Sequence, residues 1–203
     1  MARYSEEHKQ ATRARILAAA DRRIKTEGIA ATSVEEVMRD AGLTVGGFYA
    51  HFPSKEALAR EALFDGLARN VDRMFKQLEA IHDPAAWARA MIRLYLAQAD
   101  AASLDSACPL TMLLADVARS DRDTRNAFGI TTNALLERIA QRFPEVPGMT
   151  RRDAVLAVYS SCIGAVMLAR AVSSTEARRR ILGNTEAMLL RMLGLDDAQA
   201  PLL

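Results

Sequence analysis

Cysteines, histidines and aromatic residues are scarce in this chain of 203 residues, and each scarcity excludes a class of protein. Two cysteines cannot build the disulfide framework of a small secreted domain. His8, His51 and His82 are scattered, and no group of His, Cys and carboxylate residues has the spacing of a metal site. We therefore expect no metal and no cofactor.

Runs of alternating apolar and polar residues rich in Val, Ile and Thr are also hard to find, so the sequence does not predict β-strands. Residues that favour helices (Ala, Leu, Arg, Glu and Met) are plentiful, and half of the chain is hydrophobic, which is enough for a buried core. The composition therefore predicts an all-α fold of about nine helices. No glycine-rich phosphate loop or nucleophile-elbow serine is present, so we expect no catalytic residues. A small helical enzyme or a helical scaffold is the remote alternative.

Long apolar segments are missing as well. The first ten residues have no apolar core, so we expect no signal peptide. The longest uncharged stretch, residues 154–169, is shorter than the roughly 20 residues of a membrane span. These observations favour a cytoplasmic protein without a membrane partner.

Helix starts are indicated by residues that can accept a hydrogen bond from a free backbone N–H group. They are Thr44, Ser54, Asp83, Thr150 and Ser173. The basic excess lies near the N-terminus, where residues 1–25 hold seven Lys and Arg against three Asp and Glu. This excess favours contact with phosphates, although a solvated helix face would explain it equally well.

Residues 32–55 carry the strongest functional pattern. A short helix, a tight turn at Gly42 and a second very short helix form the layout that places a helix in the major groove of DNA. Gly46 and Gly47 lie in that second helix, where each glycine costs roughly 1 kcal/mol relative to alanine. Close approach of the backbone to a ligand is one reason to bear that cost.

Residues 9–63 resemble the DNA-binding domain of the tetracycline-repressor family of bacterial regulators. The resemblance lies in Arg13-x-x-Ile16-Leu17-x-Ala19-Ala20, Glu27-Gly28, Thr32-Ser33-Val34, Ala41-Gly42-Leu43 and Gly47-Phe48-Tyr49-x-His51-Phe52-x-Ser54-Lys55-Glu56. It implies a three-helix helix-turn-helix domain over residues 1–53 and a helical domain for effector binding and dimerisation over residues 54–203.

The resemblance also implies which residues contact DNA. They are Thr32, Ser33, Thr44, Val45, Gly46, Gly47, Tyr49, His51 and Lys55. Thr32 or Ser33, together with Lys55, would hold phosphates, as hydroxyl and ammonium groups do. Each residue also has a plainer interpretation: a packed tyrosine, a surface histidine or a solvated lysine. Ala50 departs from the polar or aromatic residue often found at this position in the family. Neither Ala50 nor Val45 can hydrogen-bond a base edge through its side chain, so direct readout of bases by this helix is expected to be thin.

The remainder of the chain resembles the family only in its architecture, which implies a homodimer built from the last two helices. The expected interface residues are Ala157, Ser161, Gly164, Ala165, Leu182, Met188, Leu189 and Met192. An ordinary core within one chain is the alternative. A two-fold dimer would require a near-palindromic DNA operator.

A small, largely apolar effector is expected to bind among Met and aromatic residues of the same remainder, although such residues are more often plain core. The candidates are Trp87, Met91, Tyr95, Met112, Phe128 and Tyr159. The sequence thus predicts a ligand-responsive, sequence-specific regulator of transcription, and the family resemblance favours a repressor released by the effector. An alternative is a sensor of oxidants or electrophiles that uses Cys108, because a thiolate is stabilised at the start of a helix. A buried, unreactive Cys108 is the plainer interpretation, and Cys162, within an apolar helix, is expected to be inert.

Overall fold

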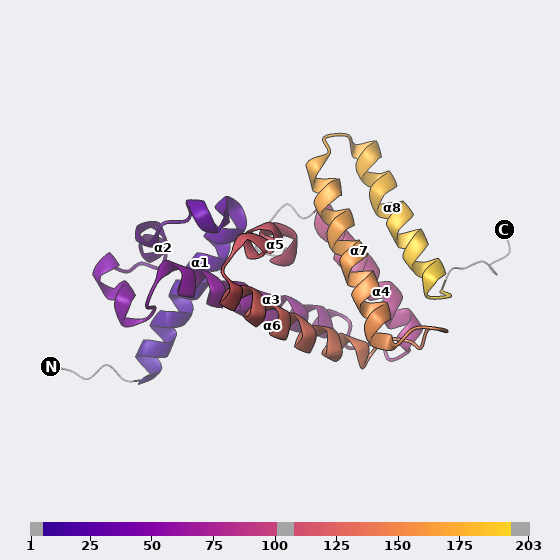
Figure 1. Cartoon of the computed structure of the whole chain (residues 1–203), viewed down its shortest axis with the longest axis horizontal. Coiled ribbons are helices and arrows are strands. Elements are labelled where there is room, and N and C mark those ends of the chain that lie inside the picture. Colours follow the sequence, from indigo (N-terminus) through magenta and orange to yellow (C-terminus); the bar gives the residue numbers. More distant parts are fainter. Residues whose placement is uncertain (1–5, 101–107, 196–203) are drawn as a thin grey trace. The chain divides into compact units, whose positions relative to one another are not determined.

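The computed structural model describes residues 6–100 and 108–195, and these residues are predominantly helical (Figure 1). In chain order the elements are α1 (Glu6–Ala31), α2 (Val34–Asp40), the 3-10 helix η1 (Val45–Ala50), α3 (Lys55–Gln77), α4 (Pro84–Leu96), the 3-10 helix η2 (Ala97–Asp100), α5 (Leu110–Arg119), α6 (Arg122–Ala140), α7 (Arg151–Ala171) and α8 (Thr175–Met192). The prediction of an all-α fold is confirmed, since the described part of the chain contains one isolated β-bridge and no strand.

Two compact units divide the chain. The first contains residues 1–69 and 103–128, and the second contains residues 70–102 and 129–203. The sequence predicts a different division, into a DNA-binding domain over residues 1–53 and an effector and dimerisation domain over residues 54–203. That division by function stays a prediction.

The first unit has a core of apolar residues from α1, α2, η1 and the beginning of α3. Its fully buried members include Ile16, Ala20, Val37, Phe48 and Phe52. The chain breaks the α1 helix at Gly28, whose φ of 83° lies in the left-handed region that glycine adopts most readily. This break lets the chain turn into α2, so that Val37 and Met38 face the same core as α1.

The second unit is organised around α7, which packs against α4 and α8. Figure 1 shows α7 and α8 as a pair of helices side by side, joined by a short loop. By length and composition alone, α7 could cross a membrane. Core helices of globular proteins have the same properties, and eight α7 residues, Val155 and Cys162 among them, are buried within this unit.

Most of the predicted helix starts are confirmed. The side chain of Ser54 accepts from the Ala57 N–H at 3.1 Å, and Asp83 accepts from the Ala86 N–H at 2.7 Å. Thr150 accepts from the Asp153 N–H at 3.1 Å. The predicted start at Ser173 is wrong by one residue.

At that start, Ser174 caps α8 by accepting from the Ala177 N–H at 3.2 Å. Two adjacent serines offer the same hydroxyl, and which of them lies at the helix end depends on the direction in which the loop leaves α7.

Candidate nucleic-acid interface

The predicted helix, turn and short helix are present in the first unit. After α2 the backbone N–H of Gly42 donates to the Arg39 carbonyl at 2.9 Å, and the N–H of Leu43 donates to the Met38 carbonyl at 2.8 Å. Gly42 has a φ of 67°, which a side chain would make costly. The turn is therefore closed by its own hydrogen bonds and fixes where η1 begins.

The short helix η1 has one inward and one outward face. Phe48 is buried and stacks on Phe52 with 5.9 Å between ring centroids, while the Arg13 guanidinium lies 4.6 Å from the Phe52 ring centre. On the outward face, Tyr49 is 72% exposed and Val45 is 44% exposed. Val45 and Tyr49 thus face solvent, while Phe48 packs η1 against the core of the first unit.

Gly46 and Gly47 are not required by packing within the first unit. A Cβ atom added at Gly46 would meet nothing within 4 Å, and one added at Gly47 would meet only the end of Met38, at 3.9 Å. Neither glycine has a positive φ. Packing among the described residues therefore gives no reason for glycine at these two positions.

Thr44, at the start of η1, makes no side-chain cap to the helix, contrary to the capping role that its sequence position indicates. Instead, its backbone carbonyl accepts from the Gly47 N–H at 3.2 Å. The residue is exposed, as are Val45 and Tyr49 of the helix that follows it.

Thr32 and Ser33 differ sharply in environment. Thr32 is buried, and its hydroxyl donates to the Gly28 carbonyl at 2.9 Å. Ser33 is half-buried and caps α2, where its hydroxyl accepts from the Glu36 N–H at 3.2 Å and donates to the Glu36 carboxylate at 3.0 Å. Of the two, Ser33 is the more exposed, and which of them contacts a phosphate stays a prediction.

Lys55 and His51 lie at the other end of the segment. The Lys55 Nζ donates to the Ala30 carbonyl at 3.0 Å, which ties the start of α3 to the end of α1. His51 lines a hollow on the surface together with residues of α1, among them His8 and Lys9. Its Nδ1 is buried and has no hydrogen-bond partner within the described part of the chain. The hollow thus brings basic side chains of α1 next to the end of η1.

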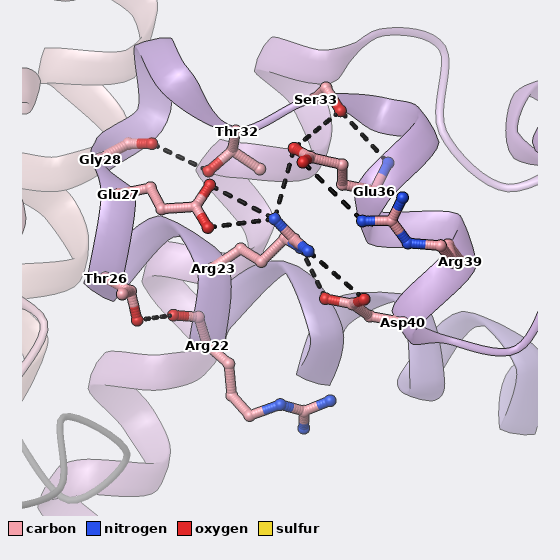
Figure 2. Close-up of polar contacts among 10 residues, drawn as sticks. All are labelled: Arg22, Arg23, Thr26, Glu27, Gly28, Thr32, Ser33, Glu36, Arg39 and Asp40. Carbon is pink, nitrogen blue, oxygen red and sulfur yellow. Dashed lines mark hydrogen bonds and ion pairs between the residues drawn. The ribbon is translucent and has the colours of Figure 1, made fainter.

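An ion-pair network that sequence analysis missed joins α1 to α2 (Figure 2). The Arg23 Nε donates to the Asp40 Oδ2 at 2.5 Å, and an Nη1 of the same guanidinium lies 3.0 Å from Glu27 and 3.3 Å from Glu36. The Arg23 bond lowers the pKa of the Asp40 carboxyl. The Ser33 hydroxyl and then the Arg23 charge lower the pKa of Glu36. The available sequence signal was a pair of carboxylates four residues apart, at positions 36 and 40.

The effector candidates fall into both units. Trp87, Met91, Tyr95 and Tyr159 are buried in the second unit, and the Tyr95 and Tyr159 rings lie 5.0 Å apart. Met112 and Phe128, both half-buried, belong to the first unit. Buried aromatic residues are compatible with a pocket lining and with plain core, so the effector site stays a prediction.

Both cysteines are buried. Cys108 lies just before Pro109, which begins α5, and is completely covered. Burial raises the pKa of the Cys162 thiol to about 12, as expected for an inert thiol in an apolar helix. Complete burial of Cys108 disfavours direct attack by an oxidant or electrophile in this conformation.

The residues expected at a dimer interface have mixed exposure. Gly164 and Met188 are exposed, whereas Ala165 and Leu189 are buried in the second unit. The others are half-buried: Ala157, Ser161, Leu182 and Met192. Sequence analysis missed three exposed apolar residues of α7, namely Leu156, Met167 and Leu168.

Comparison with known proteins finds relatives of the N-terminal part of the first unit. The family model for bacterial regulatory proteins of the tetR family matches residues 16–62, which contain α2, the turn and η1. The HTH-type transcriptional regulator TtgR of Pseudomonas putida is 36% identical over 80 residues, covering 39% of this chain and 38% of the relative. The uncharacterized HTH-type transcriptional regulator YfiR of Bacillus subtilis is 32% identical over 75 residues, covering 37% of each chain. The match therefore spans less than half of these curated relatives.

Solved structures extend the likeness to the fold of nearly the whole chain. The reduced form of E. coli NemR has a TM-score of 0.73 at 20% identity, covering 93% of this chain and 100% of that one. A TetR transcriptional regulator from Chloroflexus aurantiacus has a TM-score of 0.71 at 24% identity, covering 92% and 98%. The curated relatives are named as transcriptional regulators, in agreement with the prediction that the chain is not an enzyme.

Proposed function

The chain belongs to the tetR family of bacterial regulatory proteins, and on that premise we propose that it binds a specific DNA operator through the outward face of η1. Thr44, Val45 and Tyr49 would meet the major groove, with Ser33 and Lys55 at phosphates on the flanks. His51 and the basic residues of α1 around it would add a contact to the backbone.

The observation that carries this proposal is the outward face of η1 with its unexplained glycines. A glycine in a short helix costs stability, yet nothing within 4 Å of a Cβ at Gly46 requires it. Close approach of DNA to the backbone supplies the missing requirement. Tyr49 beside it offers a ring for packing and a hydroxyl for a phosphate or base edge.

Gly46→Ala tests this reasoning because folding and binding should respond in opposite directions. The variant should unfold at the same or a slightly higher denaturant concentration. Its free energy of unfolding should rise by up to about 1 kcal/mol, because alanine favours a helix. Its affinity for a duplex selected by the wild-type protein from a random library should fall. An affinity equal to the wild type would contradict close approach at Gly46.

We also propose that the protein is a homodimer that uses α7 and α8, as the family resemblance implies. Supporting this, α7 exposes an uncharged face on which Leu156, Gly164 and Leu168 lie at helical spacing, and Leu168 is 55% exposed. A two-fold pair of such faces would bury these residues and present two η1 segments to a near-palindromic operator.

Leu168→Asp tests the dimer, with Ile130→Asp as the matched control. Ile130 is even more exposed, at 73%, but it lies on α6. Sedimentation should find the Leu168 variant monomeric and the Ile130 variant dimeric. Dimers of both variants would contradict an interface on this face of α7.

The remaining parts of the proposal rest on family resemblance. A small, largely apolar effector would bind among the aromatic residues of the second unit and release the protein from DNA, which would make it a repressor. Since an effector acts by its differential affinity for two states, a coupling of roughly 1–3 kcal/mol would weaken DNA binding between 5- and 150-fold. A regulator of this kind acts where the chromosome is, so we place it in the cytoplasm.

A further inference from the structure

Arg23 of α1 contacts α2 in its first turn and at its last residue. One edge of the guanidinium holds Asp40, the last residue of α2, with Nε at 2.5 Å and Nη2 at 3.4 Å from the two carboxylate oxygens. Another nitrogen lies 3.3 Å from Glu36, in the first turn of the same helix. Only 16% of the Arg23 side chain is exposed. The Arg23 side chain of α1 therefore binds α2 at Glu36 and at Asp40, one helical turn apart (Figure 2).

A second arginine of α1 also contacts this region, since the Arg15 Nη2 donates to the carbonyl of Ala41, the C-cap of α2, at 2.5 Å. That bond holds one backbone oxygen just beyond the helix, whereas Arg23 holds two side chains within it. Helix α2 has seven residues, and its fully buried side chains are Val37 and Met38. Apolar contacts are not directional, so two buried residues still allow a short helix to turn about its axis. A two-pronged arginine–carboxylate bond has a preferred geometry and resists that rotation. Arg39 does not replace it, because Arg39 belongs to α2 itself and its contact with Glu36, at 3.8 Å, lies within that helix.

The orientation of α2 is passed on to the residues proposed to contact DNA. Ser33 caps its first turn, and its last carbonyls accept the hydrogen bonds from Gly42 and Leu43 that close the turn. Helix η1 begins two residues later and contacts α2. A rotation of α2 would therefore move the flanking serine and the outward face of η1 together.

We propose that Arg23 is a positioning residue for DNA recognition: by holding Glu36 and Asp40 it fixes the orientation of α2 and thereby of η1. The inference rests on the proposed function, since it needs η1 to read DNA. Arg23 itself does not have to touch DNA, because its guanidinium is occupied by carboxylates of the protein.

The alternative is that Arg23 acts only as one more positive charge near phosphates. Arg22 provides the matched control, because it carries the same charge and Figure 2 shows its guanidinium directed away from the three carboxylates. Asp40→Asn separates the two explanations further. Removal of an acidic charge should by itself tighten DNA binding, whereas loss of the Arg23 contact should weaken specific binding.

The experiment measures the affinity of each full-length variant for two labelled duplexes, one selected by the wild type from a random library and one of scrambled sequence. Arg23→Met should bind the selected duplex about tenfold more weakly than Arg22→Met does. This is the loss in affinity expected when one good base contact is lost. Both variants should lose the same amount of affinity for the scrambled duplex, because binding to that duplex depends mainly on charge. Asp40→Asn should lose affinity for the selected duplex only, and Arg23→Lys should restore part of the loss in Arg23→Met.

Thermal unfolding of the same samples distinguishes positioning from collapse. The Glu36 and Asp40 side chains are 36% and 35% exposed, so water can solvate both carboxylates when Arg23 is replaced, and the unfolding midpoints should stay close to the wild type. If Arg23→Met does not fold, Asp40→Asn and Arg23→Lys still decide the question. Equal losses in Arg22→Met and Arg23→Met, or tighter specific binding by Asp40→Asn, would overturn the inference alone. A wild-type protein that selects no duplex would overturn the proposed function as well.

Discussion

Gly66 of α3 lies so close to Asp21 of α1 that a Cβ added to the glycine would stand 2.7 Å from a carboxylate oxygen. The same Cβ would stand 3.1 Å from the ring of Pro109, at the start of α5. Asp21 cannot move away freely, because it is buried and its other oxygen accepts from Lys25 at 2.9 Å. The glycine thus allows three helices of the first unit to meet around one buried ion pair.

Gly66→Ala is therefore expected to destabilise the protein by about 1–3 kcal/mol, since overpacking would force Asp21 or Pro109 to shift. Gly183→Ala is the control, because a Cβ there would meet nothing within 4 Å on α8. The control should be neutral or stabilise the helix by up to about 1 kcal/mol. Urea unfolding followed by circular dichroism measures both, and equal midpoints for the two variants would refute the steric account.

The buried pair itself leads to a second prediction. Lys25→Met leaves the Asp21 carboxylate buried beside the partly exposed Arg69 as its remaining partner, and should cost about 3 kcal/mol. Adding Asp21→Asn removes the uncompensated charge and should recover part of that loss. A double variant no more stable than Lys25→Met would indicate that packing of the lysine chain, rather than the ion pair, is what matters.

Acid should loosen the contact between α1 and α2. The pKa values of Glu36 and Asp40 are lowered in the folded protein, so these carboxylates stabilise it above their unfolded pKa values. That contribution is lost as the pH falls through the lowered pKa values. Carbon-13 NMR titration should find both carboxyls titrating below their ordinary range. Arg23→Met should raise the Asp40 pKa more than the Glu36 pKa, because Arg23 is the main cause of the lowered pKa only at Asp40. Unchanged titration in the variant would show that the network does not hold these charges.

Thiol labelling distinguishes the proposed regulator from the alternative of a Cys108 sensor. Both cysteines are buried, and the Cys162 thiol has a pKa of about 12, so neither should react with an aromatic disulfide reagent in the native protein at pH 8. Both should react once the protein is denatured. Rapid native labelling that disappears in Cys108→Ser would favour the sensor.

The all-α fold and the helix-turn-helix could be predicted from the sequence because both depend on local patterns. Gly28 and Gly42 have the positive φ angles typical of glycine at helix ends and turns. Phe48 is buried and Tyr49 is exposed because neighbouring residues of a short helix point in different directions, although their rings still meet edge to face, with 5.1 Å between centroids.

The Arg23 network could not be predicted in the same way. It joins residues 17 positions apart, and their meeting depends on how α2 crosses α1 after the break at Gly28. Charged residues on a helix such as α1 are usually a solvated face. The exposure of Leu156, Met167 and Leu168 escaped prediction for a related reason, since an apolar helix carries no local signal of which face its neighbours cover.

The most direct test of the central claim is a selection of bound duplexes from a random library by the wild type and by Tyr49→Ala, at two salt concentrations. The account predicts that the wild type enriches one near-palindromic sequence and that Tyr49→Ala does not. Residual binding by the variant should then weaken steeply with salt, as binding to phosphates alone does. If both proteins enrich the same sequence equally, η1 is not the element that reads DNA and the account is contradicted.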